Sequence, residues 1–375
     1  MMRLANARVV LPDAVLSGSV TVTAGRIRAI DAGASPRGTC DLQGDFLLPG
    51  MVDLHTDNLE RHVQPRNNSR WPSRSALIAH DAQCTASGIT TVFDALCLGN
   101  VGFEKARVKT FQDGLSDLQS LAGRNVLRAE HFLHLRCELP DPEMPELLDR
   151  AIDDKLVRLV SLMDHSPGVG QYVDVERYHR MRMSEGWSAA EVDRTIGLLQ
   201  ANRAAYSEPN RRLVLDLSRA RGIPVASHDD RTTGEVARNH ADGITIGEFP
   251  VTLEAARAAH ACGMQVIAGA PNIVRGGSHS GNVAALELVS AGLTDALASD
   301  YVPAAMLEAA FAAAERGLLP LPRAIFLVTA GPADVAGLAD RGRIAPGLRA
   351  DLVRVRLHDG QPVVRAVWRE GERVA

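Results

Sequence analysis

The feature that most constrains the fold is a series of short apolar segments that alternate with helical segments between residues 51 and 335. Eight of the apolar segments have the length of β-strands and are predicted at 51–55, 89–94, 131–138, 157–165, 223–228, 244–249, 264–270 and 296–300. Strands that alternate with helices favour a parallel sheet. Because polar residues stand at the C-terminal ends of the strands throughout, the pattern favours an α/β fold with a (β/α)8 TIM-like barrel over an open doubly wound sheet.

The two ends of the chain follow a different pattern, in which apolar and polar residues alternate between turn residues, as in 18–30 and 352–356. This alternation predicts short antiparallel strands. Neither end is large enough to fold alone. We therefore expect 1–50 and 336–375 to pair into one small β-sandwich domain beside a barrel domain formed by 51–335.

Composition excludes several classes of protein. The formal net charge is -4, from 41 basic and 45 acidic residues, so neither nucleic acid nor an anionic membrane surface is an expected partner. No apolar segment is long enough to span a membrane or resembles a signal peptide, and we expect a cytoplasmic protein. The five cysteines show no CxxC spacing, which argues against a disulfide framework and a structural zinc knuckle.

The predicted strands end in residues that bind metals. These residues are His55, Asp57, Glu138, His165, His228 and Asp300. Because the C-terminal ends of the strands converge at one mouth of a barrel, the six side chains are expected to meet there. Nitrogen and oxygen donors without thiolate suit zinc, with manganese or iron as alternatives, and six donors suit two divalent metal ions better than one.

Asp300 is the candidate catalytic residue. A divalent metal lowers the pKa of a water molecule that it holds, and a carboxylate nearby can take the proton of that water. The alternative is that Asp300 caps the helix expected to begin near Pro303.

A second group of candidate residues lies in the glycine-rich segment 269–282, where glycine allows close approach of a ligand and arginine offers a planar set of donors. This composition favours a site for a polyphosphate, with a plain structural turn as the alternative. The substrate-binding candidates here are Asn272, Arg275, Gly276, Gly277, Ser278 and His279.

Three further residues, Arg61, His80 and Arg136, could contact an anionic substrate from the rim, or could be solvated or paired locally. The segment 171–211 is a charged helical insertion, which is either a lid, an oligomer contact or an ordinary decoration of the barrel.

With these residues, the chain resembles the amidohydrolase superfamily of metal-dependent hydrolases. It is most similar to one branch, the diphosphatases that act on α-D-ribose 1-methylphosphonate 5-triphosphate in the carbon–phosphorus lyase pathway of phosphonate breakdown. The resemblance runs along nearly the whole chain and is carried by LPGMVDLHTDNLERHVQPR (48–66), AEHFLHLRCELP (129–140), VSLMDHSPG (160–168), ASHDD (226–230), GAPNIVRGGSHSGNVAA (269–285) and SDYVPAAMLEAAF (299–311).

The resemblance implies that a phosphorylated ribose is the substrate and that its triphosphate is hydrolysed between the α and β phosphorus atoms, which releases pyrophosphate. Asp300 would manage the proton, and the metals with Arg275 would spread the charge of the departing group. Many members of the superfamily bridge two metals with a carboxylated lysine. None of Lys105, Lys109 and Lys155 falls at a predicted strand end, so Glu138 is the expected substitute. A homodimer is possible.

Two other functions fit the same fold. The first is an amidohydrolase that opens a cyclic amide or deaminates a base, for which the Arg275 segment would have no use. The second is a non-catalytic barrel within a phosphonate-processing assembly. A scaffold has no reason to keep six titratable groups together, because burying such groups is costly.

Overall fold

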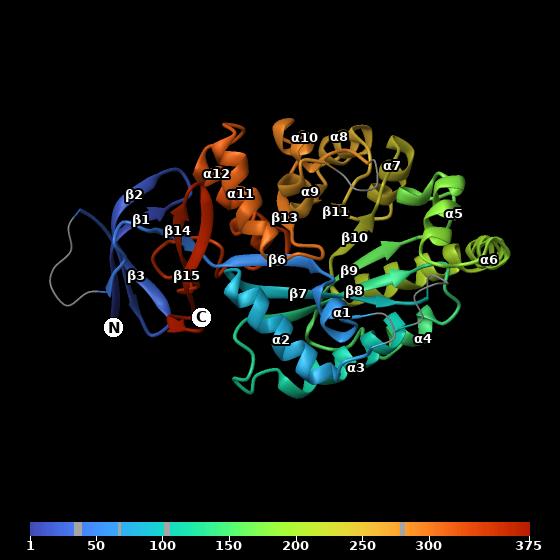
Figure 1. Ribbon diagram of the computed structural model, residues 1–375, viewed down its shortest axis with the longest axis horizontal. Helices are drawn as coiled ribbons and strands as arrows, with labels where there is room; N and C mark the ends of the chain where they lie inside the picture. The colour runs from blue at the N-terminus through green and yellow to red at the C-terminus, as the bar shows by residue number, and fades with distance from the viewer. Residues whose placement is uncertain (34–39, 67–68, 101–105, 278–281) are drawn as a thin grey trace.

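Eight parallel strands form a barrel in the computed structural model, which describes residues 1–33, 40–66, 69–100, 106–277 and 282–375. The strands are β6 (Met51–Thr56), β7 (Ile89–Leu98), β8 (Glu130–Glu138), β9 (Val157–Met163), β10 (Val225–His228), β11 (Ile246–Glu248), β12 (Gln265–Gly269) and β13 (Ala296–Ala298). They pair in chain order from β6 to β13 (Figure 1). Each of the eight predicted segments overlaps one of these strands, and the predicted α/β barrel is confirmed.

The barrel is nearly closed by backbone hydrogen bonds just beyond the ends of β6 and β13. The Asp300 N–H donates to the His55 carbonyl at 2.9 Å, and the Asp57 N–H donates to the Asp300 carbonyl at 2.6 Å. We call this junction between β6 and β13 the seam of the barrel. Deeper in the seam, the buried Asp53 carboxylate accepts the Ser299 N–H at 3.0 Å. The seam therefore brings three predicted site residues, His55, Asp57 and Asp300, to one place.

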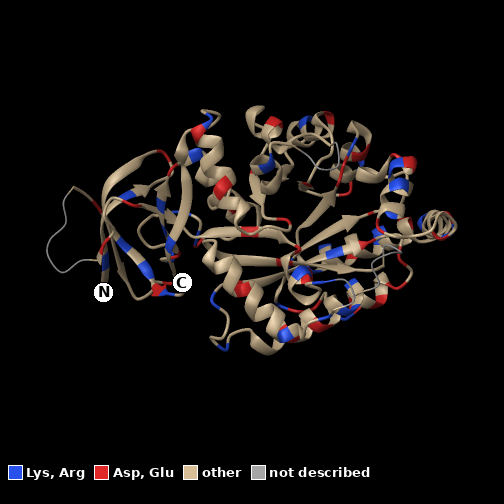
Figure 2. Cartoon of the chain, viewed as in Figure 1, with Lys and Arg blue, Asp and Glu red and all other residues tan. Residues whose placement is uncertain are grey.

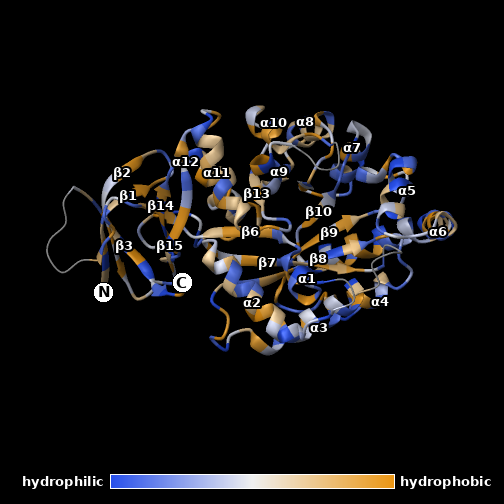
Figure 3. Cartoon of the chain, in the orientation of Figure 1, coloured by the Kyte–Doolittle hydropathy of each residue, from blue (hydrophilic) through white to orange (hydrophobic). Residues whose placement is uncertain are grey.

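Helices surround the barrel and cover its outer face. They are α1 (Asn58–Val63), α2 (Ser73–Ala86), α3 (Ala106–Leu121), α4 (Met144–Asp149), α5 (Val175–Ser184), α6 (Ala189–Arg221), α7 (Thr233–Ala241), α8 (Leu253–Ala261), α9 (Ala270–Arg275), α10 (Ala285–Ser290), α11 (Ala305–Glu315), α12 (Leu321–Phe326) and α13 (Ala330–Val335). Figure 3 shows mainly hydrophobic barrel strands inside helices of mixed character. In the described part of the chain, no helix has the length and apolar composition needed to cross a membrane.

The insertion predicted at 171–211 is helical, as expected, and consists of a short 3-10 turn (Gly170–Tyr172), α5 and most of α6. Ser188 caps α6 through a capping box with Glu191. The helix continues past Pro209 to Arg221 and ends at Gly222, whose φ is +63°. The C-terminal part of α6 thus serves as the barrel helix before β10.

Strands from both ends of the chain form a second sheet. They are β1 (Met2–Val10), β2 (Val15–Thr23), β3 (Arg26–Ala32), β4 (Cys40–Asp41), β5 (Phe46–Pro49), β14 (Leu352–His358), β15 (Gln361–Arg369) and β16 (Glu372–Arg373). The order is β16-β15-β14-β5-β1-β2-β3, with β4 beside β1. The pairing of the two ends is therefore as expected, but the strands hydrogen-bond into one mainly antiparallel sheet. It encloses its own core, which includes Leu4, Ile27 and Trp368.

Charged residues of both signs are interspersed over the helices and the terminal sheet (Figure 2), in line with the small net charge of -4. Among the described residues in this view neither sign of charge dominates, so we expect any site for an anion to be local.

One buried carboxylate ties the N-terminal strands to the C-terminal strands. Asp45, just before β5, is 3% exposed and accepts hydrogen bonds from Arg354 Nε at 2.5 Å and Arg356 Nε at 2.7 Å, both on β14.

Replacing Asp45 with Asn removes the charge that faces both guanidinium groups. We expect the free energy of unfolding to fall by about 1–3 kcal/mol, measured by urea denaturation at neutral pH. An unchanged free energy of unfolding would show that this pairing does not hold the two ends together.

Candidate active site

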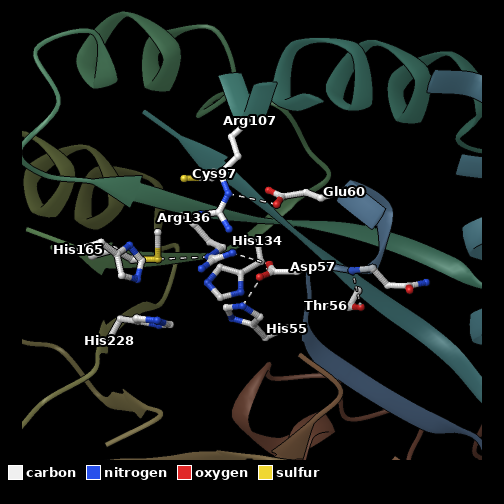
Figure 4. Close-up of polar contacts among 12 residues, drawn as sticks. His55, Thr56, Asp57, Glu60, Cys97, Arg107, His134, Arg136, His165 and His228 are labelled. Atoms are coloured by element: carbon white, nitrogen blue, oxygen red, sulfur yellow. Dashed lines mark hydrogen bonds and ion pairs between the residues drawn. The ribbon is translucent and has the colours of Figure 1, made fainter. Parts of the chain in front are cut away.

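Three histidines at the mouth of the barrel are each held through Nδ1 by a buried carboxylate (Figure 4 shows the histidines). Glu248, at the end of β11, lies 2.8 Å from His55 Nδ1 and 2.7 Å from His228 Nδ1. Glu138, at the end of β8, lies 2.8 Å from His165 Nδ1. Because each Nδ1 donates its proton to a carboxylate, Nε2 is the nitrogen left to bind a ligand.

Two groups of donors result from this arrangement. The ligand atoms of His55, Asp57 and Asp300 all lie within 4.8 Å of one another, and so do those of His165, His228 and Asp229. His228 belongs as well to a third such group with His55 and Glu248. The structure thus brings together five of the six predicted metal ligands.

The sixth predicted ligand, Glu138, lies behind His165. Its Oε1 accepts the backbone N–H of His165 at 2.7 Å, and its Oε2 accepts from the ring of the same residue. Glu138 is absent from the cavity lining, whereas His165 is part of it. In this arrangement, Glu138 orients His165.

The three histidines open onto a cavity of about 260 Å³. Its wall combines the metal-binding candidates with three arginines and with polar and apolar groups. The lining includes His55, Asp57, Arg107, Arg136, His165, Gln171, Tyr172, Arg182, His228, Asp229, Phe249, Asn272, Asn282, Asp300 and Tyr301.

Charges in the cavity wall set the protonation of the carboxylates. Although burial favours the neutral form of Asp57, the neighbouring Arg136 and His55 outweigh it and hold the pKa of Asp57 well below its usual range. Arg136 Nη1 donates directly to Asp57 Oδ1. Burial and the negative charge of Asp57 raise the pKa of Asp300 to about 6. Asp300 has a φ of +56°, so the chain holds this carboxylate in a conformation that non-glycine residues seldom adopt.

The same wall favours a positive charge at His55. Burial opposes that charge, but Glu248 and Asp57 outweigh burial and raise the pKa of His55 to about 10. A cation bound at Nε2 would replace the proton and meet the same carboxylates.

Part of the segment predicted to bind phosphate is helical. Residues 270–275 form the short helix α9, which ends at Gly276 with a φ of +82°. Asn272 lines the cavity, and its buried Oδ1 has no hydrogen-bond partner in the described part of the chain. Arg275 Nη1 lies 3.3 Å from the Tyr301 hydroxyl, and together with Gly277 and Asp300 it lines a small pocket next to the cavity. Ser278 and His279 lie outside the described residues.

The three residues predicted to lie at the rim are in different parts of the structure. Arg136 lines the cavity, as noted. Arg61 donates to the Tyr301 carbonyl at 2.8 Å and faces a neighbouring hollow. His80, on α2, is fully buried between Asn58 and Asp94, so it does not reach the cavity.

Several residues of the site, among them Asp229, Glu248, Arg107 and Arg182, were not among the sequence candidates. Glu248 could have been found, because it ends a predicted strand just as the chosen residues do. Arg107 and Arg182 carry no comparable signal, because each belongs to a helix whose position over the mouth depends on the fold.

Comparison with known sequences gives both a family and a near full-length relative. Residues 239–375 match the amidohydrolase family. The chain is 45% identical over 374 residues to an α-D-ribose 1-methylphosphonate 5-triphosphate diphosphatase from Escherichia coli K12, covering 98% of this chain and 99% of the relative. It is 28% identical over 368 residues to an imidazolonepropionase from Deinococcus deserti, covering 89% and 85% of the two chains.

Comparison with solved structures supports the fold. A 5-methylcytosine deaminase from Klebsiella pneumoniae superposes with a TM-score of 0.64 at 17% identity, covering 100% of this chain and 97% of that one. An N-acetyl-D-glucosamine-6-phosphate deacetylase from Mycobacterium smegmatis gives a TM-score of 0.63 at 16% identity and covers 100% of both chains. These similarities concern the architecture alone.

A buried network beside the site leads to a prediction about stability and pH. His131 on β8 lies between Asp94 Oδ2, at 2.7 Å, and Asp81 Oδ1, at 3.2 Å. Burial disfavours a charge on His131, but the two carboxylates outweigh burial and raise its pKa from 6.5 to about 9. A raised histidine pKa stabilises the fold fully below pH 6.5, and this stabilisation is lost as the pH rises through about 9.

We therefore expect His131 to account for up to about 3 kcal/mol of the decline in the free energy of unfolding between pH 6 and pH 10, measured by urea denaturation. The variant His131→Gln has no proton to lose at this position, so its decline should be smaller by that amount. Parallel pH profiles for the two proteins would show that His131 is not charged in the folded chain.

Proposed function

Since the chain belongs to the α-D-ribose 1-methylphosphonate 5-triphosphate diphosphatase family of amidohydrolases, we propose that it hydrolyses that triphosphate to pyrophosphate and α-D-ribose 1-methylphosphonate 5-phosphate. The observation that carries the proposal is the 45% identity, which extends over nearly the whole of both chains. The reaction places the protein in the carbon–phosphorus lyase pathway of phosphonate breakdown. A homodimer and a cytoplasmic location stay predictions.

The donors at the mouth suit divalent metal ions. His55, Asp57 and Asp300 form one group, and His165 and His228 with Asp229 form another. Imidazole and carboxylate donors without sulfur suit zinc, and also manganese or iron. We propose two ions, one for each group. When bound, they would polarise the phosphoryl oxygens and lower the pKa of a nearby water.

Asp300 is the proposed proton acceptor. Its pKa of about 6 makes it a carboxylate at neutral pH, so it can accept a proton from the attacking water. In the balanced reaction, the water oxygen bonds to the α phosphorus and the bond from that phosphorus to the bridging oxygen breaks. Pyrophosphate leaves with the electron pair.

The side chains at the β12 edge suit the phosphates of this substrate. Arg275 supplies a cation next to Asp300, and Asn272 supplies a buried polar group at the cavity wall. Arg136 keeps Asp57 ionised through its direct contact and so fixes the position of this donor. A neutral cyclic amide would have little use for the three arginines that line the cavity, which disfavours the amide-hydrolysing alternative.

The proposal is tested by phosphorus NMR of the metal-reconstituted protein with α-D-ribose 1-methylphosphonate 5-triphosphate in oxygen-18 water, next to a chelated control. We expect pyrophosphate, with the label on the ribose 5-phosphate, and no turnover in the control. Release of orthophosphate would mean cleavage at the γ phosphorus. No turnover at verified metal occupancy would contradict the proposed function.

Replacing Asp300 with Asn should lower kcat by about 10²–10⁴-fold, because the amide cannot accept the proton of the attacking water. Circular dichroism and metal content, measured on the same preparation, should show a folded protein that still binds metal through the remaining donors. A variant with normal kcat would remove Asp300 from the mechanism.

A further inference from the structure

The insertion reaches the cavity through its first turn. Gly170 has a φ of +49°, and a Cβ at this position would lie 3.2 Å from the Cβ of Asp229. The glycine therefore lets the turn Gly170–Tyr172 approach the loop that follows His228 very closely. As a result, Gln171 and Tyr172 form part of the cavity wall.

A series of edge-to-face aromatic contacts connects this turn to an arginine on α5. The Tyr172 ring lies 6.0 Å from the His165 ring and 5.0 Å from the Tyr178 ring. The Arg182 guanidinium lies 5.1 Å from the centre of the Tyr178 ring. Arg182 is 5% exposed, lines the cavity, and donates from Nη1 to Glu185 at 2.9 Å. The insertion thus places a buried cation beside aromatic rings in the cavity wall.

The order of the strands around the barrel places Arg182 and Arg275 at different parts of the mouth. Arg182 follows the fourth barrel strand, β9, whereas Arg275 follows the seventh, β12. Arg136 stands on the third strand, β8, which is opposite the seventh in a ring of eight. The cavity wall therefore has cations on two sides, with the histidines and carboxylates between them.

Resting on the proposed function, we propose that Arg182 binds the methylphosphonate group on C1 of the ribose, while the Arg275 side binds the triphosphate on C5. The substrate carries anionic groups at both ends. Asp300, the proposed proton acceptor, also lines the small pocket of Arg275, and Arg182 lines the main cavity but not this pocket. A methylphosphonate ester presents two oxygens and a methyl group. A planar guanidinium matches the oxygens, and the neighbouring Tyr172 ring offers an apolar surface to the methyl group.

This assignment makes Arg182 a specificity-determining residue. A triphosphate that lacks the C1 phosphonate would lose nothing when Arg182 is removed, whereas the true substrate would lose a charge-assisted hydrogen bond. The insertion would then be the part of the fold that separates this substrate from other triphosphates.

The test compares kcat/KM for α-D-ribose 1-methylphosphonate 5-triphosphate with kcat/KM for 1-deoxyribose 5-triphosphate. We expect Arg182→Gln to lower the first value about 10- to 100-fold and the second less than threefold. Arg275→Gln should lower both values by a similar factor, because both compounds carry the triphosphate. The matched control is Arg180→Gln on the same helix, whose side chain is 68% exposed and lies outside the cavity lining; both of its values should stay at wild type.

Equal losses on both compounds for Arg182→Gln would overturn the proposal, and so would no loss on either. If that variant does not fold, Arg182→Lys keeps the charge and should lose selectivity for the phosphonate by a smaller factor; unchanged selectivity would then overturn the proposal. Failure of wild-type protein to release pyrophosphate from either compound would contradict the proposed function itself, and this outcome is distinct from a change in the ratio.

Discussion

The site depends on a carboxylate that has no contact with solvent. Glu248 is fully buried and accepts from two histidines that come from different strands of the barrel. Burial disfavours the charge on Glu248, yet the histidines hold its pKa well below the ordinary value. A buried carboxylate is tolerated only when its partners are well placed. This requirement fixes the ring orientations of His55 and His228, and through them the direction of both Nε2 atoms.

The seam of the barrel adds a second constraint. Backbone hydrogen bonds between His55, Asp57 and Asp300 join the end of β6 to the segment that follows β13. They hold the carboxylates of Asp57 and Asp300 close together. Burial and the negative charge of Asp57 raise the pKa of Asp300, while Arg136 keeps Asp57 ionised. Two aspartates in one site therefore acquire different proton affinities, which is what a ligand and a proton acceptor require.

The sequence was sufficient for the barrel, because the period of apolar residues and the polar strand ends depend only on local chemistry. It was less informative about side-chain direction. Glu138 and Glu248 both end strands, but only the packed structure shows that each holds a histidine through Nδ1. His80 was a sequence candidate for the rim of the site, but its side chain is hydrogen-bonded to Asp94 instead. The terminal strands form one sheet rather than two, because β5 joins β1 to β14 through pairing between distant segments.

The central claim is that carboxylates at Nδ1 direct three histidines to bind divalent metal through Nε2. Anomalous diffraction at the zinc edge, from crystals of the zinc-loaded protein, tests it most directly. The account predicts anomalous peaks about 2.0–2.2 Å from Nε2 of His55, His165 and His228, with Asp57, Asp229 and Asp300 as further ligands. Peaks at the Nδ1 atoms, or zinc bound instead between His80, Asp94 and His131, would contradict it.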